Sequence, residues 1–145
     1  MDDIDQQIIR TLVRDGRATF QEIGDEVGLS ASAAKRRFDK LVAAGAVRGF
    51  TALIDPRALG WRTEAYVEVY CKGTVSPAEL RRSLETIPEV VGAVTVTGSA
   101  DALLHLLAED VAHLESALER VRDERNVDHT VSIIVLSRLI DRARD

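Results

Sequence analysis

The 145-residue sequence predicts an α+β protein, with an N-terminal winged helix-turn-helix followed by a ferredoxin-like βαββαβ domain. Two observations support this fold class. Apolar residues recur at helical spacing up to residue 45, whereas beyond residue 60 strand-like alternation is interrupted by helical segments. We place the boundary near Trp61, so that the predicted domains span residues 1–60 and 61–145.

A first helix is predicted before residue 15. Three aspartates among the first five residues complement the positive N-terminal end of a helix. The pair Asp15-Gly16 is expected to end it. Its apolar stripe consists of Ile4, Ile8, Leu12 and Val13.

Residues 19–45 predict two helices joined by a tight turn. Thr19 and Glu22 have the spacing of a capping box at the start of the first helix. Gly28 can take the left-handed conformation that ends a helix, and Ser30 is the expected N-cap of the second.

The second of these helices carries a focused positive charge. Ala34, Phe38 and Leu41 recur at core spacing, which leaves Arg36 nearly opposite the core. Residues 30–48 contain five basic side chains and one acidic, a net charge of +4 within a chain of net charge −5. Such a patch favours nucleic acid over a membrane surface, because arginine and lysine reach guanine edges and phosphates in the major groove. The candidate contacts to double-stranded DNA are Ser30, Ser32, Lys35, Arg36, Arg37, Lys40 and Arg48.

A basic patch by itself is also typical of the solvated face of an ordinary surface helix. Here the capping box, the glycine turn and the pattern AAKRRFDKL occur together. This combination favours the DNA-binding interpretation over the solvated face.

The segment after Gly45 is predicted to be extended. The run AVRGFTALID is expected to form the wing hairpin, with Arg48 placed to meet a phosphate. Residues 55–60, DPRALG, are rich in turn-forming residues and are expected to link the two domains.

The second half is predicted to alternate strands with helices. Ser76 and Glu79 form a second capping box with Pro77 at the first helical position, and Asp110 is placed to cap another helix. The predicted strands are residues 64–71, 90–97, 102–108 and 127–136. The resulting order, β-α-β-β-α-β, is that of a ferredoxin-like domain.

This order predicts an assembly. A βαββαβ unit carries both helices on one face of its sheet, and the other face should be polar if it meets water. Residues 103, 104, 106 and 107 are all leucine, and residues 133–136 are all apolar, so these strands have no polar face. We therefore expect a homodimer with sheets packed face to face.

Composition limits the remaining classes of function. The single cysteine, Cys71, permits no internal disulfide and no multi-cysteine metal site, and the three histidines occur singly. No nucleophile–base pair or phosphate-binding loop is recognisable, so we expect neither an enzyme nor a cofactor. The sequence has no apolar run near 18 residues and no signal peptide, which favours the cytoplasm.

The chain resembles the Lrp/AsnC, or feast/famine, family of transcription regulators over nearly its whole length. The resemblance rests on the segments DDIDQQIIRTLVRDGRAT, EIGDEVGLSASAAKRRFDKLVAAGAVRGF, IDPRALG and VTGSADALL in this order. It implies an N-terminal DNA-binding domain and a C-terminal domain for effector binding and oligomerisation. It also implies dimers that assemble further, commonly to octamers, and an amino acid or related metabolite as effector, bound between subunits.

The resemblance also implies an effector site. The family's turn is usually Gly-Asp-aromatic-Asp, and the neighbouring subunit completes the pocket with hydroxyl residues. Alanine in place of the aromatic residue should widen the pocket or remove amino-acid binding, and a plain hairpin turn is the alternative. The corresponding residues here are Gly98, Ser99, Ala100 and Asp101 in the turn and Thr130 and Ser132 in the last strand.

Two other classes of function stay open on the sequence. One is an enzyme of the same architecture that resembles siroheme decarboxylases, which would not need a basic recognition helix. The other is a metabolite-sensing module that regulates a partner without binding DNA.

Overall fold

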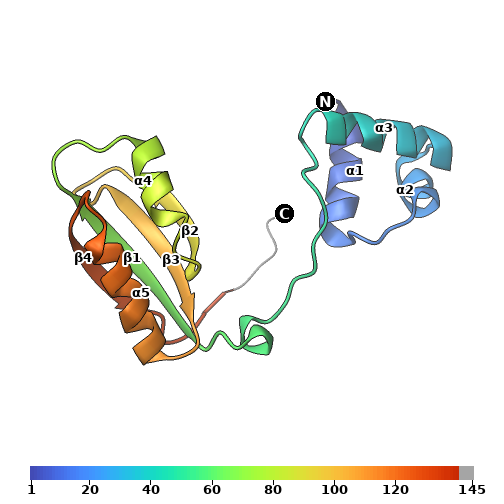
Figure 1. The fold of residues 1–145 in the computed structure, drawn as a ribbon. Coiled ribbons are helices and arrows are strands. Elements are labelled where there is room, and N and C mark those ends of the chain that lie inside the picture. Colours follow the sequence, from blue (N-terminus) through green and yellow to red (C-terminus); the bar gives the residue numbers. More distant parts are fainter. Residues whose placement is uncertain (141–145) are drawn as a thin grey trace. The chain divides into compact units, whose positions relative to one another are not determined.

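The computed structural model describes residues 1–140, which form two compact units, Met1–Leu53 and Ile54–Leu139 (Figure 1). The first unit contains the helices α1 (Asp3–Arg14), α2 (Phe20–Val27) and α3 (Ala31–Ala43). The second begins with a 3-10 turn, η1 (Pro56–Leu59), and contains both sheet and helices. Its elements are β1 (Thr63–Cys71), α4 (Pro77–Leu84), β2 (Val90–Thr95), β3 (Ala102–Ala108), α5 (Val111–Asp123) and β4 (Val127–Ile134).

This element order confirms the predicted α+β class, with a helix-turn-helix followed by a βαββαβ domain. The boundary between residues 60 and 61 stays a prediction. None of the helices in the described part of the chain combines the length and apolar character needed to cross a lipid bilayer.

Helices α2 and α3 begin at the capping residues that the sequence predicted, and α2 ends at the predicted glycine. The Thr19 hydroxyl accepts from the Glu22 N–H at 3.2 Å, and the Glu22 carboxylate accepts from the Thr19 N–H at 2.7 Å. Gly28 ends α2 with φ of 71°, and the Ser30 hydroxyl caps α3. The core between the helices is formed by Ile8, Ile23, Ala34 and Leu41, which are at most 5% exposed.

The predicted wing hairpin is wrong for this chain, since residues 46–55 form no strand. The N–H groups of Ala46 and Val47 instead donate to the Leu41 carbonyl, at 2.9 and 3.2 Å. The Phe50 ring then packs on the Phe38 ring with centroids 6.0 Å apart. The backbone that would have opened a hairpin is therefore bonded to the C-terminal end of α3.

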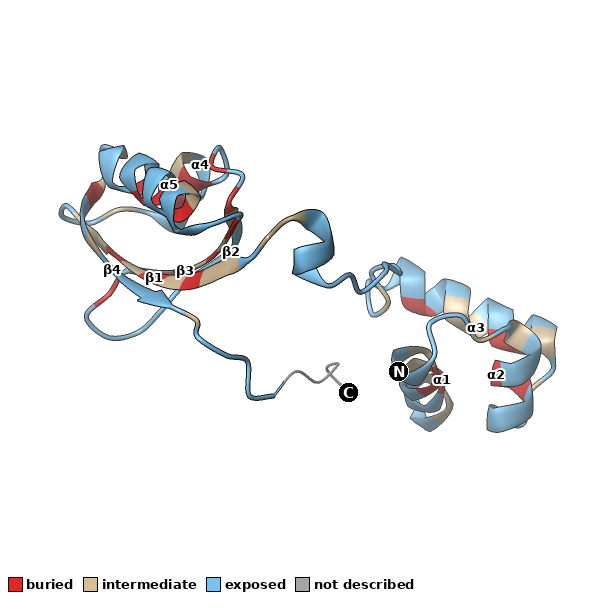
Figure 2. Ribbon diagram, turned by 90° about the horizontal axis from the view of Figure 1, so that it is seen from below, coloured by how far each residue is buried: buried red, intermediate tan, exposed pale blue. Residues whose placement is uncertain are grey.

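The C-terminal sheet is antiparallel throughout, in the order β2-β3-β1-β4, and both α4 and α5 lie on one of its faces (Figure 2). Val67 of β1, Leu104 of β3 and Leu114 of α5 are at most 2% exposed and anchor the core between the layers. Strands β2 and β4 end at Thr95 and Ile134, slightly before their predicted ends.

The opposite face of the sheet, which we call the helix-free face, mixes apolar and polar side chains. Val94, Val131 and Ile133 on this face are 58%, 45% and 54% exposed. Two ring stacks lie beside them, Tyr66 on His105 and Tyr70 on His129, with centroids 4.9 and 4.3 Å apart. No helix of the described chain covers these residues, and apolar surface therefore stays in contact with solvent in one chain.

Candidate nucleic-acid and effector sites

Helix α3 is held in the N-terminal unit by one face and exposes the other. Ala34 and Leu41 are buried, and the Phe38 ring packs on the Phe20 ring of α2 with centroids 5.4 Å apart. Side chains at the i, i+4 and i+8 positions of the opposite face then line up along the helix. They are Ser32, Arg36 and Lys40, and all three are exposed.

Two of the cations on this exposed face have no internal partner. Within the described residues, Arg36 and Lys40 make no side-chain hydrogen bond or ion pair. Lys35 pairs with Asp39 at 2.7 Å, but both side chains are more than half exposed. Exposed pairs of this kind are weak, so Lys35 can exchange Asp39 for another anion such as a phosphate.

Arg37 differs from the other predicted DNA contacts. Its guanidinium donates to the Asp2 carboxylate at 2.8 Å and to the Asp5 carboxylate at 2.7 Å, which ties α3 to the N-terminal end of α1. These hydrogen bonds raise the pKa of Arg37. The pKa of Asp5 is lowered by the Asp2 backbone and then by Arg37. Arg37 therefore positions the helix rather than offering a free charge.

The two remaining predicted contacts lie beyond the two ends of α3. Ser30 precedes the helix, where its hydroxyl caps the Ala33 N–H at 3.3 Å and lies 3.1 Å from the Ser32 hydroxyl. Arg48 is exposed in the irregular segment after α3. The structure thus gathers Ser32, Lys35, Arg36 and Lys40 on one helix face, with Ser30 at its start.

Sequence reasoning missed one residue that shapes this site, Gly24 in the middle of α2. A Cβ atom added to Gly24 would lie 2.4 Å from the Leu29 carbonyl oxygen. The Leu29 N–H also donates to the Gly24 carbonyl at 2.8 Å. A glycine inside a helical pattern costs about 1 kcal/mol relative to alanine, and this unexplained cost was the signal that a backbone passes close by.

In the turn between β2 and β3, Gly98 and Asp101 shape the predicted effector site. Gly98 has φ of 117° and is exposed. The Asp101 carboxylate accepts from the Cys71 N–H at 2.7 Å, and the Asp101 N–H donates to the Val69 carbonyl at 2.9 Å. Ala100 is 8% exposed and points into the fold. Asp101 therefore anchors its own turn to β1, and burial together with the neighbouring Asp101 carboxylate raises the pKa of the Cys71 thiol.

The hydroxyl side chains of β4 lie at the same end of the sheet but not beside this turn. Thr130 pairs with Val69 in the register, and its hydroxyl accepts from the Arg122 guanidinium at 3.0 Å. Ser132 is exposed. Because β1 lies between, Thr130 and the turn are separated by about two strand spacings, roughly 10 Å. One chain alone does not bring Thr130 and Asp101 into contact.

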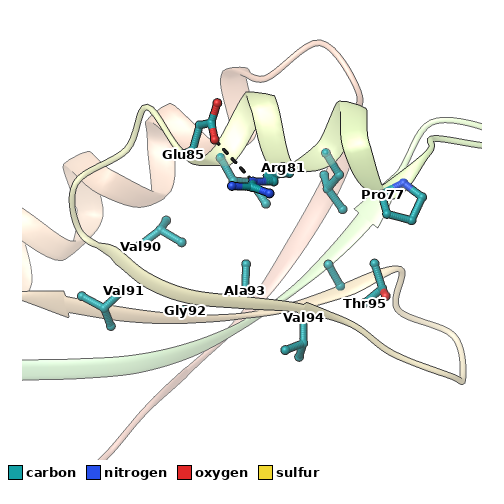
Figure 3. A pocket seen from close by; sticks show the side chains of 12 residues that line it. Pro77, Arg81, Glu85, Val90, Val91, Gly92, Ala93, Val94 and Thr95 are labelled. Carbon is teal, nitrogen blue, oxygen red and sulfur yellow. Dashed lines mark ion pairs between the residues drawn. The ribbon is translucent and has the colours of Figure 1, made fainter. Parts of the chain in front are cut away.

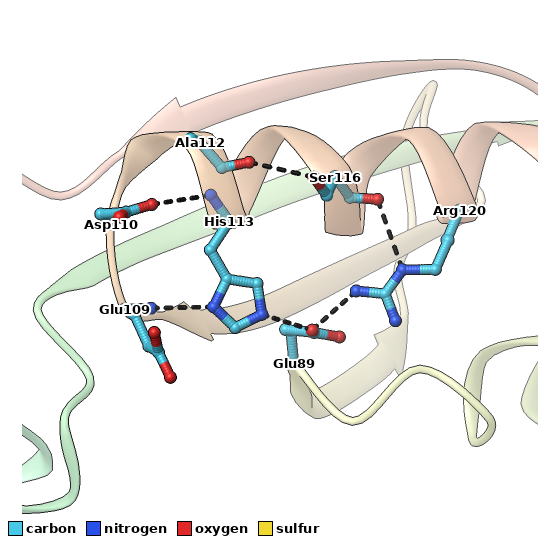
Figure 4. A network of polar contacts seen from close by, with 7 residues as sticks. All are labelled: Glu89, Glu109, Asp110, Ala112, His113, Ser116 and Arg120. Atoms are coloured by element: carbon cyan, nitrogen blue, oxygen red, sulfur yellow. Dashed lines mark hydrogen bonds and ion pairs between the residues drawn. The ribbon is translucent and has the colours of Figure 1, made fainter.

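A separate polar cluster joins α5 to the start of β2 (Figure 4). Glu89 is 4% exposed, and one of its carboxylate oxygens accepts from both His113 and Arg120 at 2.6 Å. Its other carboxylate oxygen has no hydrogen-bond partner among residues 1–140. In the part of the chain that the structure describes, no three histidine, cysteine or acidic side chains are placed to hold a metal ion.

Comparison with known proteins identifies both units. A model of the AsnC-type helix-turn-helix domain matches residues 1–42, and a model of the Lrp/AsnC ligand binding domain matches residues 64–145. The HTH-type transcriptional regulator Rv2324 of Mycobacterium tuberculosis is 52% identical over 142 residues, which cover 98% of this chain and 96% of that protein. The HTH-type transcriptional regulator LrpA of the same organism is 36% identical, with coverage of 94% and 91%.

Solved structures agree with this result. The feast or famine regulatory protein Rv3291c of M. tuberculosis, complexed with L-methionine, superposes with a TM-score of 0.91 at 34% identity and covers 99% of this chain and 97% of its own. The transcriptional regulator NMB0573 of Neisseria meningitidis, also in complex with L-methionine, gives a TM-score of 0.89 at 28% identity, with coverage of 97% and 93%.

Proposed function

The chain belongs to the Lrp/AsnC family of DNA-binding transcriptional regulators, which are not enzymes, and from this premise we propose which of its residues read DNA and bind the effector. The exposed face of α3 enters the major groove of double-stranded DNA. We infer that the protein works in the cytoplasm, where a regulator of this family meets its DNA.

The pair of unpartnered cations on α3 carries the proposal for DNA. Arg36 projects from the middle of the exposed face and donates to a base edge, since arginine binds guanine with two hydrogen bonds. Lys40, one turn further on, contacts a phosphate. Lys35 and Arg48 add phosphate contacts, and the hydroxyls of Ser30 and Ser32 lie at the N-terminal end of the helix. Arg37 holds α3 at the angle that this docking needs.

Replacing Arg36 with alanine is expected to cost about 1–3 kcal/mol of binding to the specific operator. Lys40→Ala should instead weaken binding to every sequence and lower the slope of log affinity against log salt by about 1. Fluorescence anisotropy with DNA from upstream of the protein's own gene measures both effects. Arg10→Ala, on the exposed side of α1, is the control. Operator binding by Arg36→Ala at wild-type strength would contradict the proposed docking.

The proposed effector is an amino acid bound between subunits. The two L-methionine complexes among the similar structures make L-methionine the first candidate. In this proposal the turn of one subunit supplies backbone donors at Gly98 and Ser99 for the carboxylate, and Asp101 accepts from the ammonium group. Thr130 and Ser132 of a neighbouring subunit complete the pocket, because β1 separates them from the turn of their own chain. Ala100, which is small, leaves room for a larger effector side chain.

Asp101→Asn should weaken L-methionine binding by about 1.5–3 kcal/mol, the contribution of a hydrogen bond to a charged group. The amide oxygen can still accept from the Cys71 N–H, so the turn is preserved while the charge is lost. Ligand-free DNA binding should stay at the wild-type level. Calorimetry on wild type, Asp101→Asn and the control Asp128→Asn decides the question. Equal affinities for wild type and Asp101→Asn would exclude Asp101 as a ligand contact.

We also propose that two chains pack their helix-free faces together, and that such dimers assemble further, as in an octamer. The half-exposed side chains of Val94, Val131 and Ile133 support this proposal, because burying apolar surface stabilises an interface.

Ile133→Glu is expected to convert the dimer to monomers, since a carboxylate would have to lose its water in an apolar interface. Ile133 is 54% exposed in the single chain, so the substitution should leave the monomer folded. Light scattering after size-exclusion chromatography measures the mass. Val111→Glu, at a 61% exposed position on α5, is the control. A dimeric Ile133→Glu protein would rule out packing through this face.

A further inference from the structure

A groove of about 380 Å³ runs between helix α4 and the edge strand β2 (Figure 3). Leu80 and Leu84 line its helical side, and the side chains of Val90 and Ala93 face them from the strand. The volume lies within the range of small-molecule sites, about 300–1,000 Å³. None of the residues proposed above for DNA or effector binding lines this groove.

The groove is apolar inside and carries one charge of each sign at its rim. Arg81 lies on α4, and Glu85 is the residue that follows its C-terminal end, one helical turn later. The Arg81 guanidinium and the Glu85 carboxylate lie 3.6 Å apart, at the long end of ion-pair distances. Their side chains are 83% and 55% exposed, so the pair contributes little to stability. Either group can therefore exchange its partner for an opposite charge on a ligand.

We propose that this groove binds the zwitterion of an apolar amino acid within a single chain. The ligand carboxylate accepts from the planar Arg81 guanidinium, which suits two parallel hydrogen bonds. The ligand ammonium group donates to Glu85, and its side chain packs between Leu84 and Ala93. The inference shares the class of ligand with the proposed function, but none of the residues Gly98–Asp101 of the proposed effector turn lines this groove.

An extended peptide or a second copy of the chain is the alternative occupant, because β2 is an edge strand with the uncharged sequence VVGAVT and could pair with a further strand. The register of β2 shifts between Val90 and Gly92, where an irregularity interrupts the ladder. Bulges on edge strands block the pairing of a further strand. The two opposite charges at the rim match a single zwitterion. The irregularity in β2 disfavours the addition of a further strand.

Calorimetry of the full chain with L-methionine, L-leucine and L-phenylalanine tests the site. Arg81→Met should lower the affinity for whichever of these amino acids binds by at least about 10-fold, because a hydrogen bond to a charged group is lost. Ala93→Leu should block binding by filling the groove from the strand. Arg82→Met is the matched control, because Arg82 is on the same helix but does not line this groove.

Analogues of the ligand test the two charges separately. For L-methionine, 4-(methylthio)butanoate lacks the ammonium group and 3-(methylthio)propylamine lacks the carboxylate. Each should bind the wild type at least about 10-fold more weakly than L-methionine, by the same loss of a charged hydrogen bond. Glu85→Gln should remove the preference for L-methionine over the butanoate. If Ala93→Leu lowers the melting temperature strongly, Arg81→Met and Glu85→Gln decide, because both substitutions change only the rim of the groove.

The outcomes separate this site from the one at Asp101. Loss of binding in Asp101→Asn with unchanged binding in both Arg81→Met and Ala93→Leu overturns the groove and supports the site between subunits. Loss in the groove variants alone supports the groove. A change of oligomeric mass in Ala93→Leu at unchanged ligand affinity means that a second copy occupies the groove, and this overturns the inference. Absence of binding by all three amino acids also overturns it, while DNA reading by α3 is unaffected.

Discussion

Gly24→Ala is expected to destabilise the N-terminal unit by about 3 kcal/mol, the upper end of the usual cost of overpacking. The new methyl group would lie 2.4 Å from the Leu29 carbonyl oxygen and 3.2 Å from the Ser30 carbonyl carbon. Both obstacles are backbone atoms, so no side chain can rotate away. Relief requires α2 and the start of α3 to move apart, which breaks the bond from the Leu29 N–H to the Gly24 carbonyl.

Hydrogen exchange of the amides in residues 20–43 measures this loss of stability in the N-terminal unit separately from the stability of the C-terminal unit. Operator binding should fall as well, because the displaced α3 no longer presents Arg36 and Lys40 at the same angle. Gly92→Ala is the control, since a Cβ there meets only the His105 Cβ at 3.6 Å, an ordinary contact. Unchanged protection in Gly24→Ala would show that the two helices can separate at little cost.

Features that depend on neighbours in sequence were predictable. The Thr19–Glu22 and Ser76–Glu79 boxes and the Asp110 cap each join side chain and backbone three residues apart. Such bonds form with the first turn of a helix, whatever the rest of the chain does. The alternation of residues 64–71 likewise predicted strand β1, whose burial alternates in the same way because one face of the sheet is covered.

Features that depend on distant residues were not predictable. Arg37 belongs by spacing to the basic patch, yet Asp2 and Asp5, more than thirty residues earlier, take up its guanidinium. The run after Gly45 has the composition of a hairpin, but its Phe50 ring packs on the Phe38 ring of α3, twelve residues earlier. A single sequence does not show which of several possible contacts such a residue makes in the folded chain. For the same reason, the net charge of +4 in residues 30–48 overstates the positive charge that is free to meet DNA.

The effector turn shows the same limit at the level of assembly. The motif predicted Gly98 and Asp101, and the structure adds that Asp101 already anchors its turn to the Cys71 N–H. Whether Thr130 completes a pocket there depends on a second subunit, since β1 separates the two within one chain. The proposed DNA contacts of Ser32, Lys35, Arg36 and Lys40 lie on a single helix, so their common face could be predicted from their spacing in the sequence.

Arg120→Met is expected to lower the free energy of unfolding at neutral pH by about 3 kcal/mol, the lower end for a broken buried pair, because Arg120 itself is 44% exposed. Glu89 would keep only His113 as a side-chain partner. The His113 Nδ1 atom accepts from the Glu109 N–H at 3.3 Å, which assigns the ring proton to Nε2, the atom that faces Glu89. The single hydrogen bond from His113 then has to balance a carboxylate that is 4% exposed and whose other oxygen has no partner among the described residues.

The loss should depend on pH in a defined direction. Burial would raise the pKa of Glu89, but the hydrogen bonds from Arg120, from the backbone and from His113 outweigh it and leave that pKa below the ordinary value of 4.5. In the wild type the carboxylate therefore adds stability above about pH 4.5, and this contribution is lost as the pH falls through the lower pKa of the folded state. Without Arg120, fewer hydrogen bonds oppose the effect of burial, so the pKa of Glu89 in the folded protein rises above its wild-type value. The stability deficit of Arg120→Met should thus be small in acid and grow as the pH rises through the lowered pKa of Glu89 in the folded wild type toward that of the variant.

Urea unfolding of wild type and Arg120→Met between about pH 4 and pH 8 measures this difference, with Arg122→Met, exposed on the same helix, as the control. Glu89→Gln removes the titrating group, so the further loss caused by Arg120→Met in that background should be independent of pH. A deficit of Arg120→Met that stays constant across the pH range in the Glu89 protein would mean that the arginine acts through packing alone. A deficit that grows toward acid would mean that the sign of the Glu89 shift is wrong.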